Sequence, residues 1–205
     1  MKKGIKILLV VLIIASVGSM GYFLGYPLYL DSIEDPVFEL PVNDIDEVTG
    51  IQVFHDPRST QLHNGYDFKL ENDTDIYAPI AGKVSNVKKH RMSNDYWLID
   101  VFITIDPKWK MFIAFEPWTQ DESVIDDQME NITVQEGDIV SVGDHVGILN
   151  PVKDSEFPHI HWNVIEYTTA VGDDQNRNPY FYVSDDAKAD MDYLCSKFSS
   201  DCTLE

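Results

Sequence analysis

The feature that most constrains this fold is a series of short apolar runs between about Ile51 and Tyr167. The runs are rich in Val, Ile, Tyr, Phe and Trp, as in "DYWLIDVFITI" and "HIHWNVIEY", and Gly, Pro, Asn and Asp separate them. Branched and aromatic residues in short segments between turn-forming residues are typical of antiparallel strands. The sequence therefore predicts an all-β domain over residues 51–170, built as an antiparallel sheet or sandwich.

The first thirty residues differ from the rest of the chain. No charged residue occurs from Ile7 to Leu30, a run long enough for a helix to cross a hydrocarbon core of roughly 30 Å. Lysines precede the run and acidic residues follow it, which predicts a cytoplasmic N-terminus and an extracytoplasmic domain. Residues 1–30 are therefore expected to form a membrane anchor. Small residues at 15–19 leave a cleaved signal peptide, and hence a secreted domain, as the alternative.

An acidic stretch follows this run. Residues 31–50 contain Pro36 and Pro41 and lack a clear period, so we expect a spacer between membrane and domain. The whole chain of 205 residues has a formal net charge of −20. Such a charge disfavours nucleic acid and anionic lipid as partners.

The C-terminal part, residues 171–205, is expected to be a loop followed by a short helix. Ser184 can cap this helix, because acidic residues occupy the first turn that would follow. Cys195 and Cys202 are the two cysteines of the chain. In an exported protein, two cysteines this close are expected to form a disulfide.

Two short stretches offer metal-binding side chains. "HNGYDF" carries His63 and Asp67, where Gly65 favours a turn leading into a strand. "FPHIHWNVIE" carries His159 and His161, which point to the same face if the stretch is a strand. Taken alone, the His63 and Asp67 pair is also compatible with a surface turn, and the His159 and His161 pair with a polar sheet face that binds no metal. Together they supply two histidines and one carboxylate, the ligand set of a catalytic zinc with one open position, and the remaining histidine is free to act as a base.

At these residues the chain resembles the lysostaphin/LytM-type zinc endopeptidases. "HNGYDF" is similar to their His-x-Gly-x-Asp segment, "DIYAPIAGKVSNV" and "EGDIVSVGDHVGIL" to their next strand pair and hairpin, and "PHIHWNV" to their last histidine strand. The resemblance implies a duplicated-hybrid-motif fold of the barrel-sandwich type. It implies Zn²⁺ held by His63, Asp67 and His161, with His159 as the catalytic histidine. It also implies hydrolysis of peptide cross-links in cell-wall peptidoglycan, or in another envelope polymer.

One segment departs from the family pattern. The family usually carries a further active-site histidine in a Y-x-H-L strand, and the corresponding strand here is "FIAFEP". We expect Phe115 to stand where that histidine would sit, with Glu116 facing the opposite side of the strand. This departure favours an alternative function, a catalytically weakened or inactive binding or regulatory module of the cell envelope. The presence of all three metal ligands favours a working site.

Overall fold

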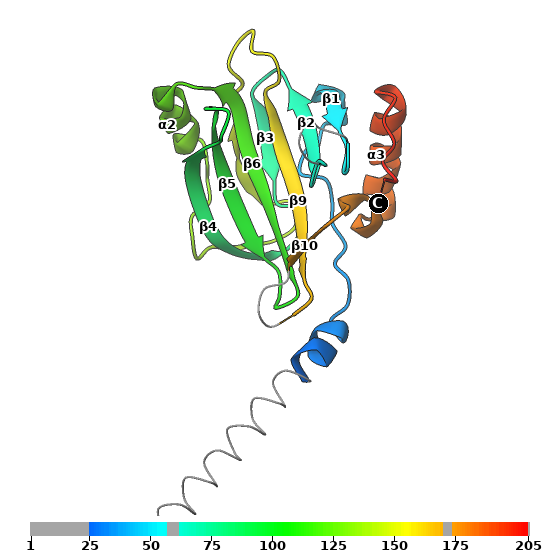
Figure 1. Cartoon of the computed structure of the whole chain (residues 1–205). Coiled ribbons are helices and arrows are strands. Elements are labelled where there is room, and N and C mark those ends of the chain that lie inside the picture. The colour runs from blue at the N-terminus through cyan, green and yellow to red at the C-terminus, as the bar shows by residue number, and fades with distance from the viewer. Residues whose placement is uncertain (1–24, 57–61, 170–173, 205) are drawn as a thin grey trace, which may run out of the picture.

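The computed structural model describes residues 25–56, 62–169 and 174–204, and these residues form a mostly β structure around a curled antiparallel sheet (Figure 1). The strand order in the sheet is β1-β2-β9-β6-β5-β4-β7, with β10 also paired to β9, and β3 pairs with β8 in a smaller sheet. This confirms the predicted antiparallel fold. The strands are β1 (Val48–Gln52), β2 (Tyr66–Leu70), β3 (Thr74–Tyr77), β4 (Gly82–Arg91), β5 (Trp97–Thr104), β6 (Trp109–Thr119), β7 (Ile139–Val140), β8 (His145–Leu149), β9 (His159–Tyr167) and β10 (Asp174–Arg177).

Strand β9 shows how the sequence divides the sheet into two faces. Its residues Ile160, Trp162 and Val164 alternate along the strand and are completely buried in the hydrophobic core. His159 and His161 lie between them and therefore point to the other face of the sheet. The central place of β9, between β2 and β6, lets side chains from three strands meet on that face.

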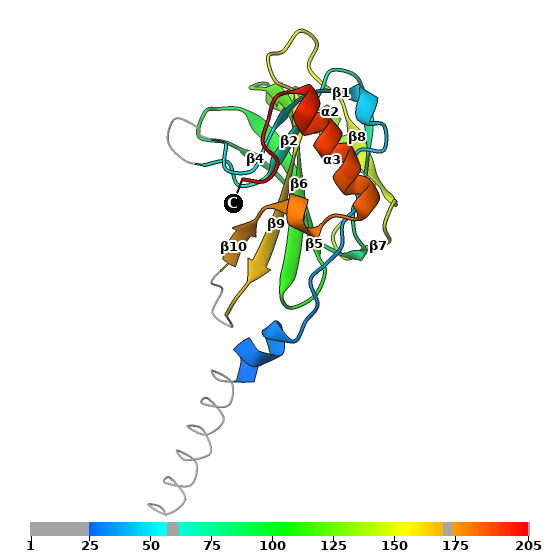
Figure 2. The same ribbon diagram turned by 90° about the vertical axis from the view of Figure 1, so that its right-hand side faces the viewer.

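Besides the helical residues 25–31, two α-helices accompany the sheet within the described residues. The predicted C-terminal helix is confirmed as α3 (Asp185–Lys197), and the Ser184 side chain accepts a hydrogen bond from the Ala187 amide. Figure 2 shows α3 along the side of the sheet that carries β1. The helix α2 (Glu122–Glu130) was not predicted, although Asp121 caps it in the usual way. Two short 3₁₀ helices, η1 (Ile45–Glu47) and η2 (Pro179–Tyr182), complete the fold.

The segment expected as an acidic spacer packs against the domain. Phe38 is fully buried, and its ring meets the ring of Trp162 edge-on at 5.8 Å between centroids. The Phe38 amide donates to the Tyr182 carbonyl, and the Phe38 carbonyl accepts from the Ser184 amide. Leu40 and Val42 are also buried. Phe38, Leu40 and Val42 of this stretch thus belong to the core.

The predicted membrane anchor falls mainly outside the described residues. Residues 25–31 are helical. Among the residues that the structure describes, no helix is both long and apolar enough to span a membrane.

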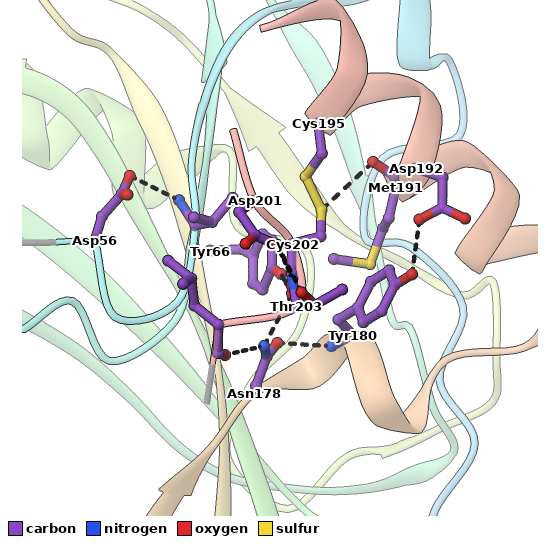
Figure 3. The surroundings of a disulfide bond; sticks show 12 residues. Asp56, Tyr66, Asn178, Tyr180, Met191, Asp192, Cys195, Asp201, Cys202 and Thr203 are labelled. Atoms are coloured by element: carbon purple, nitrogen blue, oxygen red, sulfur yellow. Dashed lines mark hydrogen bonds between the residues drawn. A yellow bond between two sulfur atoms is a disulfide. The ribbon is translucent and has the colours of Figure 1, made fainter. Parts of the chain in front are cut away.

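The predicted disulfide between Cys195 and Cys202 is confirmed (Figure 3). The carbonyl of Cys202 accepts hydrogen bonds from the Tyr66 hydroxyl at 2.8 Å and from the Asn178 side chain at 3.0 Å. Burial raises the pKa of the Tyr66 hydroxyl, which therefore stays a donor. Because Tyr66 directly precedes Asp67 in β2, the disulfide-closed loop is tied to the strand that carries a candidate metal ligand.

Candidate metal centre

Pairing of β2 with β9 brings the two histidine-bearing stretches together. Asp67 lies directly opposite His161 in the antiparallel register, so both side chains leave the sheet on the same face. His63 lies in the turn before β2 and reaches the same point. Its Nε2 atom is 3.0 Å from Oδ1 of Asp67 and 3.0 Å from Nδ1 of His161. The third edge of this triangle, from His161 Nδ1 to Asp67 Oδ1, is 2.7 Å.

This donor set fits a zinc ion. Zinc takes two imidazole nitrogens and a carboxylate oxygen in catalytic sites, at about 2.0–2.2 Å, so tetrahedral ligand atoms lie about 3.3 Å from one another. The observed triangle is only slightly tighter than that. All three residues are buried, and their ligand atoms converge on one point. A buried cluster of this kind is costly without a cation to balance the carboxylate and separate the nitrogen lone pairs.

The backbone around the centre fixes how His63 presents its ring. Its Nδ1 atom lies 2.8 Å from the Val53 carbonyl oxygen. A carbonyl can only accept, so Nδ1 carries the proton and Nε2 offers its lone pair to the centre. Such outer partners set the tautomer of a metal-binding histidine. No pattern in the sequence indicates this role of Val53.

Gly65 lets the turn come close to β9. A Cβ atom at this position would collide with the Trp162 carbonyl and would lie 2.8 Å from Cε1 of His161. A side chain here would therefore push away either the β9 backbone or a ligand ring. The glycine of the HNGYD stretch is thus required by the packing of the centre itself.

His159 lies beside the centre. Its Nδ1 atom donates to the Phe157 carbonyl at 2.7 Å, which turns Nε2 toward Asp67 Oδ1 at 3.7 Å. Burial alone would raise the pKa of Asp67, but the imidazole of His159 and the rings of His161 and His63 hold that pKa well below its usual range. Asp67 therefore stays a carboxylate, and His159 is within reach of a group bound at the centre.

The expectation for Phe115 was wrong by one position. In the register of β6 with β9, Phe115 lies opposite Ile160 and is fully buried in the core. Glu116 lies opposite His159 on the face of the metal centre, and its Oε2 atom is 3.5 Å from His159 Nε2. The position that faces the catalytic candidate therefore carries a carboxylate.

A cleft of about 380 Å³ opens beside these residues. Its lining includes residues that sequence reasoning did not single out, from β6, the loop before β9 and the β4–β5 turn. These residues are Met92, Asn94, Trp118, Glu156 and Phe157. No local motif marks them, because loops far apart in the chain supply them. The rest of the lining is Gln52 of β1 and the residues already described, Asp67, Glu116, His159 and His161. The cleft therefore opens onto Asp67 and His161 of the candidate metal centre.

Comparison with known proteins places this geometry among related folds. No protein-family model matches the sequence, and no curated protein matches it. Among solved structures, the chain is similar to the SpoIIQ–SpoIIIAH pore-forming complex, with a TM-score of 0.50 and 16% identity, over 74% of this chain and 93% of that one.

Two further solved structures are named as peptidases or M23 proteins. One is a mutant of the catalytic domain of the prophage-encoded M23 protein EnpA from Enterococcus faecalis, with a TM-score of 0.45, 20% identity, and coverage of 63% and 88%. The other is the antimicrobial peptidase lysostaphin from Staphylococcus simulans, with a TM-score of 0.44, 16% identity, and coverage of 64% and 48%. At these identities the likeness concerns the fold alone.

Proposed function

We propose that this protein is an exported zinc metalloendopeptidase that hydrolyses peptide cross-links of the cell wall. The observation that carries the proposal is the convergence of His63 Nε2, Asp67 Oδ1 and His161 Nδ1 on one point beside an open cleft. Three protein ligands leave the fourth position of a tetrahedral zinc for water or substrate. In this proposal the sheet corresponds to the duplicated-hybrid-motif type, and residues 1–30 anchor the chain with its domain outside the cytoplasm. The disulfide is in keeping with an oxidising compartment.

The side chains have distinct roles in the proposed reaction. A bound zinc ion would polarise the scissile carbonyl and lower the pKa of water toward neutrality. His63, Asp67 and His161 would hold it. His159, fixed by its bond to the Phe157 carbonyl, would present Nε2 to the reacting group and could accept a proton there. The cleft would align an extended peptide with these groups.

A second candidate is a binding or regulatory module with little or no turnover. The observation that favours it is Glu116, which stands on the site face where the resembling family carries an imidazole. A carboxylate cannot donate a hydrogen bond to a developing oxyanion while it is ionised. Loss of one such donor typically lowers the rate by about 10² to 10³.

The test is the zinc content and peptide-cleaving activity of the full chain in detergent micelles. We expect about one zinc per chain, lost in His63→Ala and in His161→Ala. His159→Ala should keep the zinc and lower cleavage of oligoglycine peptide or peptidoglycan by about 10² to 10⁴. His145→Ala is a matched control, because His145 lies in β8 and bonds Asp75 away from the centre.

The outcomes separate the two candidates. Zinc binding without any cleavage above the His159→Ala background would favour the binding module. A chain that takes up no zinc when zinc is offered at neutral pH would refute both the metal centre and the enzyme.

A further inference from the structure

Behind the metal centre, the core side of β2 is tied to the C-terminal loop. Tyr66 directly precedes Asp67, so their side chains leave the strand on opposite faces. Asp67 points to the metal centre, and the fully buried Tyr66 side chain belongs to the core. The Tyr66 hydroxyl donates to the Cys202 carbonyl at 2.8 Å (Figure 3). Two neighbouring residues of β2 therefore connect the metal centre to a carbonyl that lies 136 positions after Tyr66 in the sequence.

The acceptor of this hydrogen bond is itself held from other sides. The disulfide links Cys202 to Cys195 of α3, and both cysteines are buried. The Asn178 side chain donates to the Cys202 carbonyl at 3.0 Å and to the Leu204 carbonyl at 2.6 Å. A covalent bond and side-chain hydrogen bonds thus fix the place at which Tyr66 is anchored.

The metal centre tolerates little movement of β2. Asp67 lies opposite His161 of β9, and their ligand atoms are 2.7 Å apart. At Gly65 the turn before β2 is already so close to β9 that a Cβ atom would collide with the Trp162 carbonyl. On its other side β2 pairs with β1, a strand of five residues that ends the described strand order. Groups outside the ligand set that orient metal ligands typically change metal affinity by about 10- to 100-fold.

We propose that Tyr66 is a positioning residue, through which the Cys195–Cys202 disulfide holds Asp67 in the geometry that binds the metal. The zinc affinity of the chain then depends on the redox state of a disulfide that supplies no ligand. This inference rests on the proposed function and deepens it by naming a regulation of the same site. The reduced chain binds zinc weakly, and the oxidised chain binds it tightly.

Closure of the disulfide is a two-electron oxidation. The thiols of Cys195 and Cys202 exchange with the disulfide of an oxidant, so one S–S bond forms in this chain and one breaks in the oxidant. The two protons pass to the two thiols that the oxidant releases. Oxidising compartments favour this exchange, and the reducing thiols of the cytoplasm oppose it. The metal centre therefore reaches its full affinity only after export, in the compartment of the proposed substrate.

The test measures zinc affinity by competition with a chromogenic chelator, on the full chain in detergent micelles. Tyr66→Phe removes the link to β2, while the Cys202 carbonyl keeps its hydrogen bond from Asn178. We expect the affinity to fall about tenfold. Tyr180→Phe is the matched control, because it removes the hydroxyl of another buried tyrosine, which donates to Asp192 at 2.7 Å. It should leave the affinity unchanged.

A double-mutant cycle tests whether the disulfide acts through Tyr66. The Cys195→Ser, Cys202→Ser variant should also weaken zinc binding about tenfold. If both changes break the same link, adding Tyr66→Phe to the serine variant should weaken binding by less than about threefold more. Independent effects would instead multiply to about a hundredfold. Urea unfolding identifies conditions in which every variant is folded, so that a loss of stability is not read as a loss of affinity.

Hydrogen exchange of the metal-free chain gives a readout that needs no zinc. Tyr66→Phe and the double serine variant should each speed exchange of the β2 amides, relative to those of β5, by at least about threefold. Tyr180→Phe should leave this ratio unchanged.

Unchanged zinc affinity in Tyr66→Phe would overturn the proposal. So would independent effects in the cycle, or an equal loss of affinity in Tyr180→Phe. If the unaltered chain takes up no zinc, the proposed function fails, and exchange of the β2 amides then decides the positioning role of Tyr66 by itself. Faster exchange in both variants would support that role, and unchanged exchange would overturn it. Zinc binding and peptide cleavage that are equal in all variants would refute the role of the disulfide and leave the proposed function standing.

Discussion

The burial of Phe38 leads to a prediction about where the folded domain begins. Truncating the side chain with Phe38→Ala keeps the backbone bonds to Tyr182 and Ser184 but empties a fully buried site against Trp162. Phe→Ala changes in cores typically cost about 3–5 kcal/mol, because the transfer free energy is lost and a cavity remains. For a domain of this size, about 2–4 °C per kcal/mol gives a fall in Tm of about 6–20 °C.

The assay is urea unfolding of the full chain followed by tryptophan fluorescence, with calorimetry for Tm. Val37→Ala is the matched control, since Val37 is the neighbouring residue and 62% of its surface is exposed. It should change the free energy of unfolding by less than about 0.5 kcal/mol. A loss below about 1 kcal/mol for Phe38→Ala would refute the packing described above, and residues 31–42 would then be a detachable spacer.

Three further predictions concern the rest of the domain. Gly65→Ala should weaken zinc binding at least about tenfold, measured by competition with a chromogenic chelator, because the new methyl group displaces His161; unchanged affinity would contradict the close approach. Loss of the disulfide in a Cys195→Ser, Cys202→Ser double variant should lower stability by about 2–3 kcal/mol in urea unfolding, and an unchanged midpoint would contradict it. Burial raises the pKa of Asp100 to about 6, so the folded domain binds this proton more tightly than the unfolded chain does. The resulting stabilisation of the folded state is fully present below about pH 4 and is lost as pH rises through 6. Asp100→Asn should therefore stabilise the domain by up to about 3 kcal/mol at pH 7.5 and not at pH 3.5; the same gain at both pH values would refute this.

The residues of each candidate ligand pair could be named from the sequence, because each pair lies within one short segment. Strand periodicity places His159 and His161 on one face wherever that strand lies. The choice of His161 rather than His159 as the third ligand came from the resemblance, and in the pairing of β2 with β9 His161 lies opposite Asp67. The start of α3 and the disulfide could also be predicted, because a cap residue and a short spacing between cysteines are features of neighbouring residues.

The identity of the residue facing His159 could not be predicted in the same way. Strand β6 is buried on both faces around Phe115 and Glu116, so its sequence lacks the alternation that would mark an inner and an outer side. A shift of one residue exchanges the two faces of a strand. Only the register against β9 decides that Glu116 faces the site.

The sequence by itself determined the antiparallel β class, the acidic character, the covalent loop at the C-terminus and the residue types able to hold zinc. These follow from composition and from spacing within single segments. The tertiary structure decided that Phe38 belongs to the core and that Glu116, Glu156 and Trp118 share one cleft. Such contacts join segments far apart in the chain, and they depend on strand register and close packing, which no local pattern encodes.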